Sequence, residues 1–437
     1  MKFFKTFFAM AAVLAAFFCA GNAYSEVLTI SEGLKLATRD NRLVKIARDE
    51  EKIARSDTRM ARAPMLPSVN AAYDQTFLAS EPKAVFGPLT VPTSQKDFYA
   101  LSVNVQQTLW DFKGNASRYG ASKMVLESKK YDTSRIRNLV ALNFTLAYLD
   151  LLESERLVQV AQDEVNRLES HLKDAENLYN QGVITKNDLL QAQVRISDAK
   201  QRLVNAKNVR DVNASSVNNL ISRPLTTEFQ AVDVSETPLL PETVPDIGSA
   251  WKSAEQDRPE LKIVDATLKS LNLQRESVRA DYFPKFFASG GYGYTQNRFM
   301  TPNGNWSLIL GMRFNIFNGG ATTAEISKIH GQQQQLLEQR DKIADDIRLE
   351  VQRYMLNLQS ARDRVAVTKG AVEQAKENAR INRVKYTEGV GTATDVLDAL
   401  TLLTVAETNH FTALYDLRKA EAGVLYSEGK DLSEVYK

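Results

Sequence analysis

The sequence is poor in the residues from which most catalytic and metal sites are built. Its 437 residues include one cysteine, Cys19, and three histidines, His171, His330 and His410. The histidines are far apart, and none has a cysteine or carboxylate at the spacing of a metal ligand. No glycine-rich phosphate loop and no nucleophile elbow occurs. We therefore expect no metal, no cofactor and no enzyme activity.

An excess of basic residues and long apolar runs are also missing. Fifty-five Lys and Arg stand against 53 Asp and Glu, for a net charge of +2. A nearly neutral chain offers no broad basic surface for nucleic acid. After residue 25, no segment approaches the roughly 18 uninterrupted apolar residues of a membrane helix. We expect neither a nucleic-acid partner nor a membrane-spanning helix.

The first residues have the pattern of an export signal. Lys2 and Lys5 precede an apolar run at 7–18, and Ala23-Tyr24-Ser25 places small residues at −3 and −1 before Glu26. We expect residues 1–25 to be a signal peptide, whose removal would take Cys19 with it. An exported chain of this composition is either soluble or an outer-membrane barrel.

Proline is absent from two long tracts. All 12 prolines lie in residues 64–92 or 224–302. Because proline inside a helix costs about 3 kcal/mol, the other tracts are where long helices can form. Their content of Ala, Leu, Gln, Glu, Lys and Arg agrees. We predict helices over 113–180, 187–221, 320–388 and 394–428, whose lengths imply coiled-coil-like packing.

The sequence also contains itself twice. Residues 179–190, YNQGVITKNDLL, reappear as 386–397, YTEGVGTATDVL, at an offset of 207 (386 − 179). Upstream, RAPMLP at 62–67 matches RADYFP at 279–284. Internal repeats of this size usually mean that one structural unit is used twice around an axis. We expect a first repeat at 26–223, a linker at 224–248, a second repeat at 249–430 and a C-terminal tail at 431–437.

Before each pair of predicted long helices, apolar and polar residues alternate in two stretches. These stretches cover 67–77 and 99–109 in the first half, and 286–295 and 306–316 in the second. Each has about the length of a tilted strand that crosses a bilayer. A half-buried strand of a soluble sheet has the same pattern, but four such strands behind an export signal favour the membrane.

Four strands are too few for a membrane barrel. Such barrels need about eight strands or more, and open sheet edges are not tolerated in hydrocarbon. The chain must therefore pool its strands with copies of itself, and three copies would give about 12 strands.

The duplicated turn carries a resemblance to a known family. The pattern Tyr-x-x-Gly-x-x-Thr-x-x-Asp runs from Tyr179 to Asp188 and again from Tyr386 to Asp395. VLDA at 396–399, APMLP at 63–67 and FNIFNGG at 314–320 add to it. Over its mature length the chain resembles the outer-membrane efflux proteins, the TolC-like exit ducts.

The resemblance implies an α+β membrane protein. It would be a homotrimer that shares a 12-stranded outer-membrane β-barrel, four strands per chain, continued by a long periplasmic α-helical barrel. It also implies the function: an exit duct for efflux or type I secretion, in contact with outer-membrane lipid. Substrates would come from an inner-membrane transporter of the RND, ABC or MFS type through a periplasmic adaptor.

The turn residues have roles that follow from local geometry. Gly182 and Gly389 lie where a long helix ends, a place that favours a left-handed backbone. Thr185 with Asp188, and Thr392 with Asp395, have the spacing of capping boxes at the start of the returning helices. N-terminal capping is thus the simplest role for Asp188.

Asp395 and Asp398 are three residues apart and share a helical face. By the resemblance, the hairpin tips converge at the periplasmic entrance, where three copies of this pair would form two carboxylate rings that favour cations. The alternative is a solvated helix face without a part in gating. Gly391 stands where the best-known family member has an arginine, which argues against an arginine lock. Tyr386 is expected to hydrogen-bond to the neighbouring hairpin, with Asp188 as the candidate, or to pack at the helix end.

The resemblance also assigns the segments between the helices and strands. The loops at 81–92 and 297–304 would face the outside, and residues 224–248 would form a belt around the tunnel. Two other functions fit long helical hairpins: a periplasmic adaptor, and a coiled-coil tether of the envelope without a pore. Neither needs four alternating strands. The sequence does not indicate the cargo.

Overall fold

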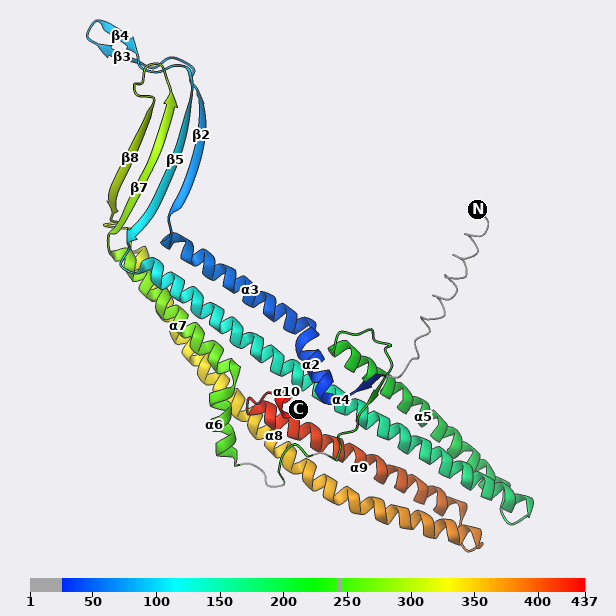
Figure 1. Cartoon of the computed structure of the whole chain (residues 1–437). Helices are drawn as coiled ribbons and strands as arrows, with labels where there is room; N and C mark the ends of the chain where they lie inside the picture. The colour runs from blue at the N-terminus through cyan, green and yellow to red at the C-terminus, as the bar shows by residue number, and fades with distance from the viewer. Residues whose placement is uncertain (1–25, 237, 242–245, 437) are drawn as a thin grey trace, which may run out of the picture. The chain divides into compact units, whose positions relative to one another are not determined.

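The computed structural model describes residues 26–236, 238–241 and 246–436 (Figure 1). The predicted signal peptide, residues 1–25, lies outside this described part. The chain divides into two compact units. The sheet unit consists of Ile46–Ile136 and Arg258–Ile347. The hairpin unit consists of the described residues up to Lys45, Arg137–Asp257 and those from Arg348 on.

The sheet unit contains a four-stranded antiparallel sheet in the order β2-β5-β7-β8. Its strands are β2 (Ser68–Phe77), β5 (Asp97–Trp110), β7 (Lys285–Gln296) and β8 (Gly304–Arg313). All four predicted strands are thereby confirmed, with ends that shift by up to three residues. The outer strands β2 and β8 have one partner each within the described residues.

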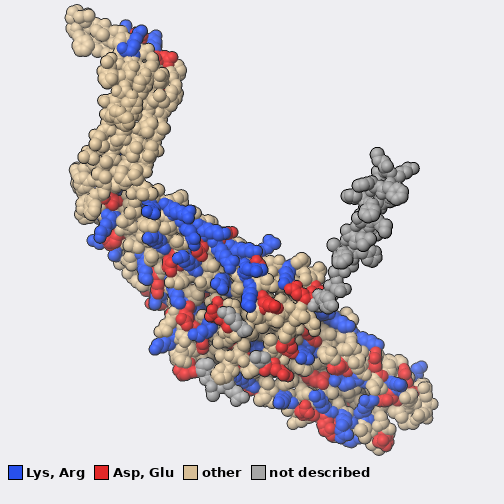
Figure 2. Space-filling model, in the orientation of Figure 1, with Lys and Arg blue, Asp and Glu red and all other residues tan. Residues whose placement is uncertain are grey.

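Aromatic side chains gather at both ends of this sheet. Near one end the rings of Tyr73 and Tyr294 lie 6.0 and 6.1 Å from that of Tyr99. Near the other, Phe112 stacks on Phe283 at 4.7 Å. Figure 2 shows that the visible face of the sheet between its two ends is free of Lys, Arg, Asp and Glu.

The loop predicted at 81–92 contains a short hairpin, which the sequence analysis did not predict. It is formed by β3 (Lys83–Phe86) and β4 (Leu89–Pro92). Gly87 turns the chain with φ +59°. Pro92 is tolerated because it is the last residue of its strand and lies in a ribbon of only two strands.

Each half of the sheet is entered in the same way. Helix α3 (Arg42–Arg62) passes into a 3₁₀ turn, η1 (Ala63–Met65), before β2. Helix α7 (Pro259–Arg279) passes into η2 (Ala280–Tyr282) before β7. The matching motifs RAPMLP and RADYFP are these two junctions.

The four predicted long helices are confirmed. They are α4 (Gly114–Asn180), α5 (Lys186–Leu220), α8 (Ala321–Thr387) and α9 (Ala393–Ser427). Within the part of the chain that the structure describes, none of the helices is both long and apolar enough to cross a membrane. In the hairpin unit all four contribute to one apolar cluster that includes Val165, Ile196 and Leu397.

The predicted linker is held against the long helices by buried polar contacts. Strand β6 (Phe229–Ala231) pairs in parallel with β1 (Glu26–Leu28). The buried Tyr148 hydroxyl of α4 donates to the carbonyl of Leu28 at 2.8 Å and accepts from the amide of Val232 at 2.8 Å. These contacts use both sides of one hydroxyl, so the segment is fixed by specific bonds rather than by apolar packing alone.

The remaining helices are short. They are α2 (Ile30–Asp40), α6 (Ile247–Asp257) and α10 (Leu432–Val435). A capping box formed by Thr29 and Glu32 opens α2. The boundaries of the two sequence repeats do not coincide with the compact units, which combine parts of both halves. The division into repeats, linker and tail stays a prediction.

Candidate functional site

The tips of the two hairpins are closed by glycines in a left-handed conformation. Gly182 and Gly389 both have φ +74°. After each glycine, an amide bonds back into the helix: Val183 to the carbonyl of Leu178, and Val390 to that of Lys385, both at 2.9 Å. This is the Schellman arrangement. A Cβ on either glycine would meet nothing within 4 Å, so the backbone alone demands glycine here.

Both returning helices begin with the predicted capping box. The Thr185 hydroxyl donates to the Asp188 carboxylate at 2.7 Å, and the Asp188 amide donates back to that hydroxyl at 3.3 Å. Thr392 and Asp395 repeat the arrangement at 2.7 and 3.2 Å. Both carboxylates are therefore engaged in their own turns. Hydrogen bonds from Thr392 lower the pKa of Asp395 below its ordinary value.

Asp398 lies one turn further along α9 and is exposed, as Asp395 is. It lines a groove of about 540 Å³ between α5 and α9. On the α5 side the groove is lined by Leu190, Val194 and Asp198. The two aspartates differ in what their carboxylates do: that of Asp395 caps a helix, and that of Asp398 faces a groove.

Tyr386 does not make the predicted hydrogen bond to Asp188. Its side chain is buried, and within the described residues its hydroxyl has no hydrogen-bond partner. Its ring lies 5.1 Å from that of the equally buried His171 on α4. Burial, together with the nearby charges of Asp188 and Asp174, raises the pKa of Tyr386. Tyr386 thus packs at the end of its helix, which was the alternative to the predicted hydrogen bond.

Gly391, the departure from the family pattern, is part of a tight turn. Its amide donates to the carbonyl of Lys385 at 3.0 Å. A Cβ at this position would lie 3.0 Å from the Cβ of Lys385 and 3.1 Å from the amide of Tyr386. An arginine in its place would need a shift of the neighbouring backbone.

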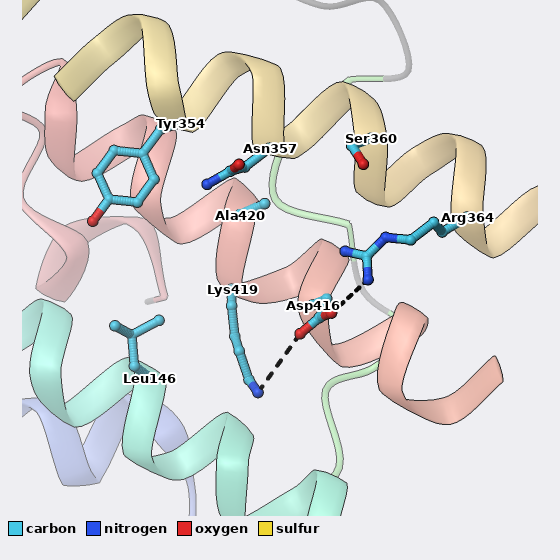
Figure 3. A pocket seen from close by; sticks show the side chains of 8 residues that line it. All are labelled: Leu146, Tyr354, Asn357, Ser360, Arg364, Asp416, Lys419 and Ala420. Carbon is cyan, nitrogen blue, oxygen red and sulfur yellow. Dashed lines mark hydrogen bonds and ion pairs between the residues drawn. The ribbon is translucent and has the colours of Figure 1, made fainter. Parts of the chain in front are cut away.

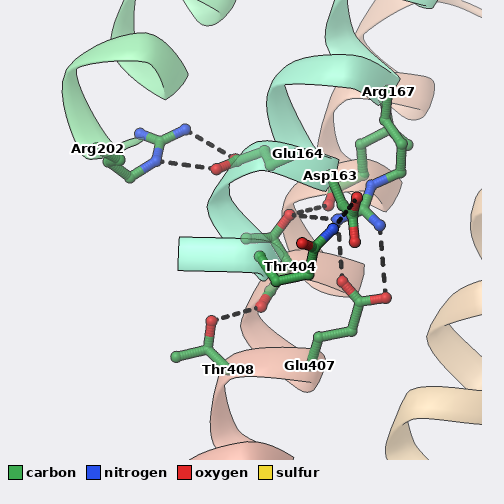
Figure 4. Close-up of polar contacts among 9 residues, drawn as sticks. Asp163, Glu164, Arg167, Arg202, Thr404, Glu407 and Thr408 are labelled. Atoms are coloured by element: carbon green, nitrogen blue, oxygen red, sulfur yellow. Dashed lines mark hydrogen bonds and ion pairs between the residues drawn. The ribbon is translucent and has the colours of Figure 1, made fainter. Parts of the chain in front are cut away.

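The hairpins are joined by ion pairs that the sequence analysis missed. Arg167 on α4 binds Glu407 on α9 at 3.0 Å and also donates to Thr404 (Figure 4). Within the first hairpin, Arg202 on α5 binds the buried Glu164 on α4 at 2.8 Å. Charged residues are common on α4, α5 and α9, so only the packing of these helices reveals which charged residues pair.

A third cross-link lies nearer the tips. Arg383 on α8 donates to the Ser170 hydroxyl at 2.7 Å and to the Asp174 carboxylate at 3.1 Å, both on α4. It lies one turn before Tyr386. The first and second hairpins are therefore linked by charged groups as well as by the apolar cluster.

Further from the tips, a cavity of about 340 Å³ lies between α4, α8 and α9 (Figure 3). Arg364 binds Asp416 at 2.9 Å on its rim. Burial alone would lower the pKa of Lys419, but its bonds to Asp150 and Glu153 raise it. The charged side chains at the cavity, Arg364, Asp416 and Lys419, are thus paired with partners of opposite charge. Among the described residues, no cluster of His, Cys, Asp and Glu has the arrangement of a metal site.

The sequence profile of the outer membrane efflux protein family matches residues 33–222 and 250–427, which is most of the chain. The chain belongs to this family. It is accordingly a TolC-like outer-membrane protein with a role in efflux. No curated protein sequence matched the chain.

Solved structures of outer-membrane proteins, some of them channels, have the same fold. VceC of Vibrio cholerae is 16% identical with a TM-score of 0.78, over 92% of this chain and 96% of VceC. MtrE of Neisseria gonorrhoeae, solved in its open state, is 18% identical with a TM-score of 0.76, over 92% and 89%. The channel OprN is 17% identical with a TM-score of 0.78, also over 92% and 89%. At these identities the likeness shows the fold alone.

Proposed function

We propose that this efflux protein works as a homotrimeric exit duct. Three copies share a 12-stranded barrel in the outer membrane, and their long helices form a tunnel with its entrance at the hairpin tips. The observation that carries this is the open sheet. Strands β2 and β8 each keep one unpaired edge in the described structure, which hydrocarbon does not tolerate. Pairing β8 of one copy with β2 of the next removes every edge.

The side chains of the sheet support the same arrangement. Trp306, Leu308 and Leu310 on β8 are 77%, 76% and 72% exposed, which suits contact with lipid. Aromatic rings at both ends of the sheet match the girdles that membrane barrels place at the two interfaces. The charge-free face between these ends agrees (Figure 2).

The helices of the hairpin unit support assembly with copies as well. On α5, Leu190, Val194 and Val204 are exposed on the face opposite the buried residues. On α8, Leu349, Leu356 and Val367 form a comparable stripe. Two different apolar stripes on one chain suit a head-to-tail contact, which closes into a ring. That the ring has three members rests on the resemblance to the TolC-like ducts.

We assign the entrance to the hairpin tips, with Asp395 and Asp398 as its selectivity residues. Both carboxylates are exposed at the start of α9, and three copies would bring six of them together. Such rings attract cations and oppose anions. Gly182 and Gly389 shape the turns, and Asp188 caps the first returning helix. Tyr386 packs the two hairpins together.

The partners follow from the same function. A duct of this kind receives cargo from an inner-membrane transporter through a periplasmic adaptor, for efflux or for type I secretion. Docking of such partners belongs to the tips, where the α5–α9 groove opens. The adaptor and tether functions are disfavoured, because the chain belongs to an efflux family and carries four membrane-length strands.

Single-channel recording of the detergent-extracted protein in a planar bilayer tests this function. We expect small, mostly closed, cation-selective openings from the unmodified protein. The double variant Asp395→Ala, Asp398→Ala should conduct more and select cations less. Unchanged selectivity would remove the two aspartates from the entrance, and a well-folded oligomer without any conductance would contradict the duct.

A further inference from the structure

A histidine and a tyrosine meet inside the hairpin unit close to the tips. His171 on α4 and Tyr386 on α8 are each 3% exposed, and their ring centroids are 5.1 Å apart. Within the described residues, the two ring nitrogens of His171 and the hydroxyl of Tyr386 all lack a hydrogen-bond partner. Buried polar groups without partners are costly. The two hairpins thus meet here at a contact that contains buried polar atoms without hydrogen bonds.

The charged groups around His171 disfavour a positive charge on its ring, because Arg383 is already positively charged. Asp174 on the same helix favours the protonated ring, and Arg383 on α8 opposes it. The Asp174 carboxylate already accepts a bond from Arg383. From α5, the charge of Asp188 raises the pKa of Tyr386 and is not among the charges that shift the pKa of His171. A proton on His171 would therefore be opposed by the charge of Arg383, while the Asp174 carboxylate is already bonded to Arg383.

Tyr386 itself belongs to an apolar cluster that also includes Leu168 of α4 and Ala393 and Leu397 of α9. Burial lowers the pKa of His171, against the raising effect of Asp174. The sign follows directly: the contact is fully stable above the ordinary histidine pKa of about 6.5 and loses stability as the pH falls below it.

We propose that His171 is an acid-sensitive element of the entrance, and that a proton taken up by its buried ring loosens the α4–α8 contact and separates the hairpin tips. Two movements accommodate the charge. The ring turns out to water, or it takes Asp174 away from Arg383. Either one removes a link between the hairpins. The inference deepens the proposed function, on which its consequence for conduction rests.

The sequence repeat does not duplicate this element. At the offset of 207, His171 corresponds to Asn378, and Tyr386 corresponds to Tyr179, which is exposed. The acid response therefore belongs to one contact per chain. The other two histidines are exposed His330 and half-buried His410, whose Nδ1 lies 3.2 Å from the Thr368 hydroxyl.

Distance measurement between the tips tests the proposal without a pore. Spin labels are attached through Gln181→Cys and Glu388→Cys, two exposed tip positions, in the full oligomer. Between about pH 7.5 and about pH 5.5, which brackets the ordinary histidine range, we expect the separated population to grow. One proton per chain limits this growth to about tenfold per pH unit. His171→Phe keeps a packed ring without titration, so its distances should not change with pH.

The matched control is the double variant His330→Gln, His410→Gln, which should keep the full response. A pH response that survives in His171→Phe, disappears in the control variant or is absent from the unmodified protein overturns the proposal. If His171→Phe does not assemble, His171→Gln replaces it under the same criteria.

Conductance recorded on the same variants separates this inference from the proposed function. Acid-dependent tip distances that need His171, without conductance at any pH, would sustain the acid-sensitive contact and refute the duct. Conductance together with pH-independent distances would sustain the duct and refute the acid-sensitive contact. If both stand, acid should raise the open probability of the unmodified protein and of the control variant, but not that of His171→Phe.

Discussion

At single residues, the turns of the hairpin tips depend on backbone conformation more than on side-chain contacts. Gly389 has φ +74°, yet the space around it would admit a Cβ. Gly370, within α8, also has open space but no positive φ. Comparing the two glycines therefore separates the cost of an unfavourable backbone conformation from the cost of a steric clash.

We predict that alanine at these two positions has opposite effects. Gly389→Ala should lower the free energy of unfolding by about 1–2 kcal/mol, the cost of a left-handed alanine. Gly370→Ala should raise it by up to about 1 kcal/mol through helix propensity. Thermal unfolding of the detergent-solubilised protein measures both. Equal effects of the two variants would contradict this account.

The capped aspartate makes a prediction about pH. Because hydrogen bonds from Thr392 lower the pKa of Asp395, its ionised form stabilises the turn above the unfolded value of about 3.9. This contribution is lost as the pH falls through the lowered pKa. In the variant Asp398→Asn, reversal potentials should show a cation preference that persists down to about pH 4. Loss of the preference by about pH 5 would show that Asp395 does not supply it.

At the level of elements, a buried ion pair within α9 holds the linker through hydrogen bonds to the linker backbone. Arg418 binds Glu421 at 2.7 Å and donates to the carbonyl of Ser235 at 2.7 Å. Glu421 in turn accepts from the amide of Leu239 at 3.2 Å. Both charged side chains are buried, so each depends on the other.

We predict that breaking this pair is costly. Arg418→Met leaves Glu421 buried and unpaired, which should cost about 3–5 kcal/mol. The double variant Arg418→Met, Glu421→Leu should cost less, because no lone charge remains. Chemical unfolding of both variants gives the comparison. If the double variant is at least as unstable as the single one, the pair must stabilise the protein by more than neutralising each other's charge, for example through its hydrogen bonds to the linker.

The elements themselves could be predicted from the sequence, and their cross-links could not. Proline placement located α4 and α8 to within a residue or two, and period-two alternation located the strands. The hairpin of β3 and β4 was missed because Pro88 and Pro92 argue against strands. Contacts such as Arg383 with Asp174 join residues 209 positions apart. Which faces of two long helices meet depends on their packing, which local patterns do not encode.

The tip shows the same limit. Glycine turns and capping boxes are local, and both were predicted correctly. The partner of Tyr386 was not, because a tyrosine at a helix end can reach outward to Asp188 or inward to His171. The apolar cluster of the two hairpins decides for burial.

At the scale of the whole molecule, the exposed apolar stripes decide whether copies assemble. Val204 is 66% exposed on the outer face of α5, and Val367 is 73% exposed on α8. In the proposed ring these two stripes face each other across the contact between copies. Burying each such side chain contributes about 1.5–3 kcal/mol, and a carboxylate there would have to be desolvated without a partner.

We predict that Val204→Asp, alone or with Val367→Asp, prevents formation of a stable trimer. Lys207→Glu, at an exposed position one turn along α5 that already carries a charge, serves as the control and should assemble normally. Mass measurement of the detergent-solubilised protein by light scattering distinguishes monomer from trimer. Because the barrel cannot close without copies, the monomeric variant should also lose conductance. A trimeric Val204→Asp variant would mean that α5 does not form the contact, and that the sheet edges alone hold the copies together.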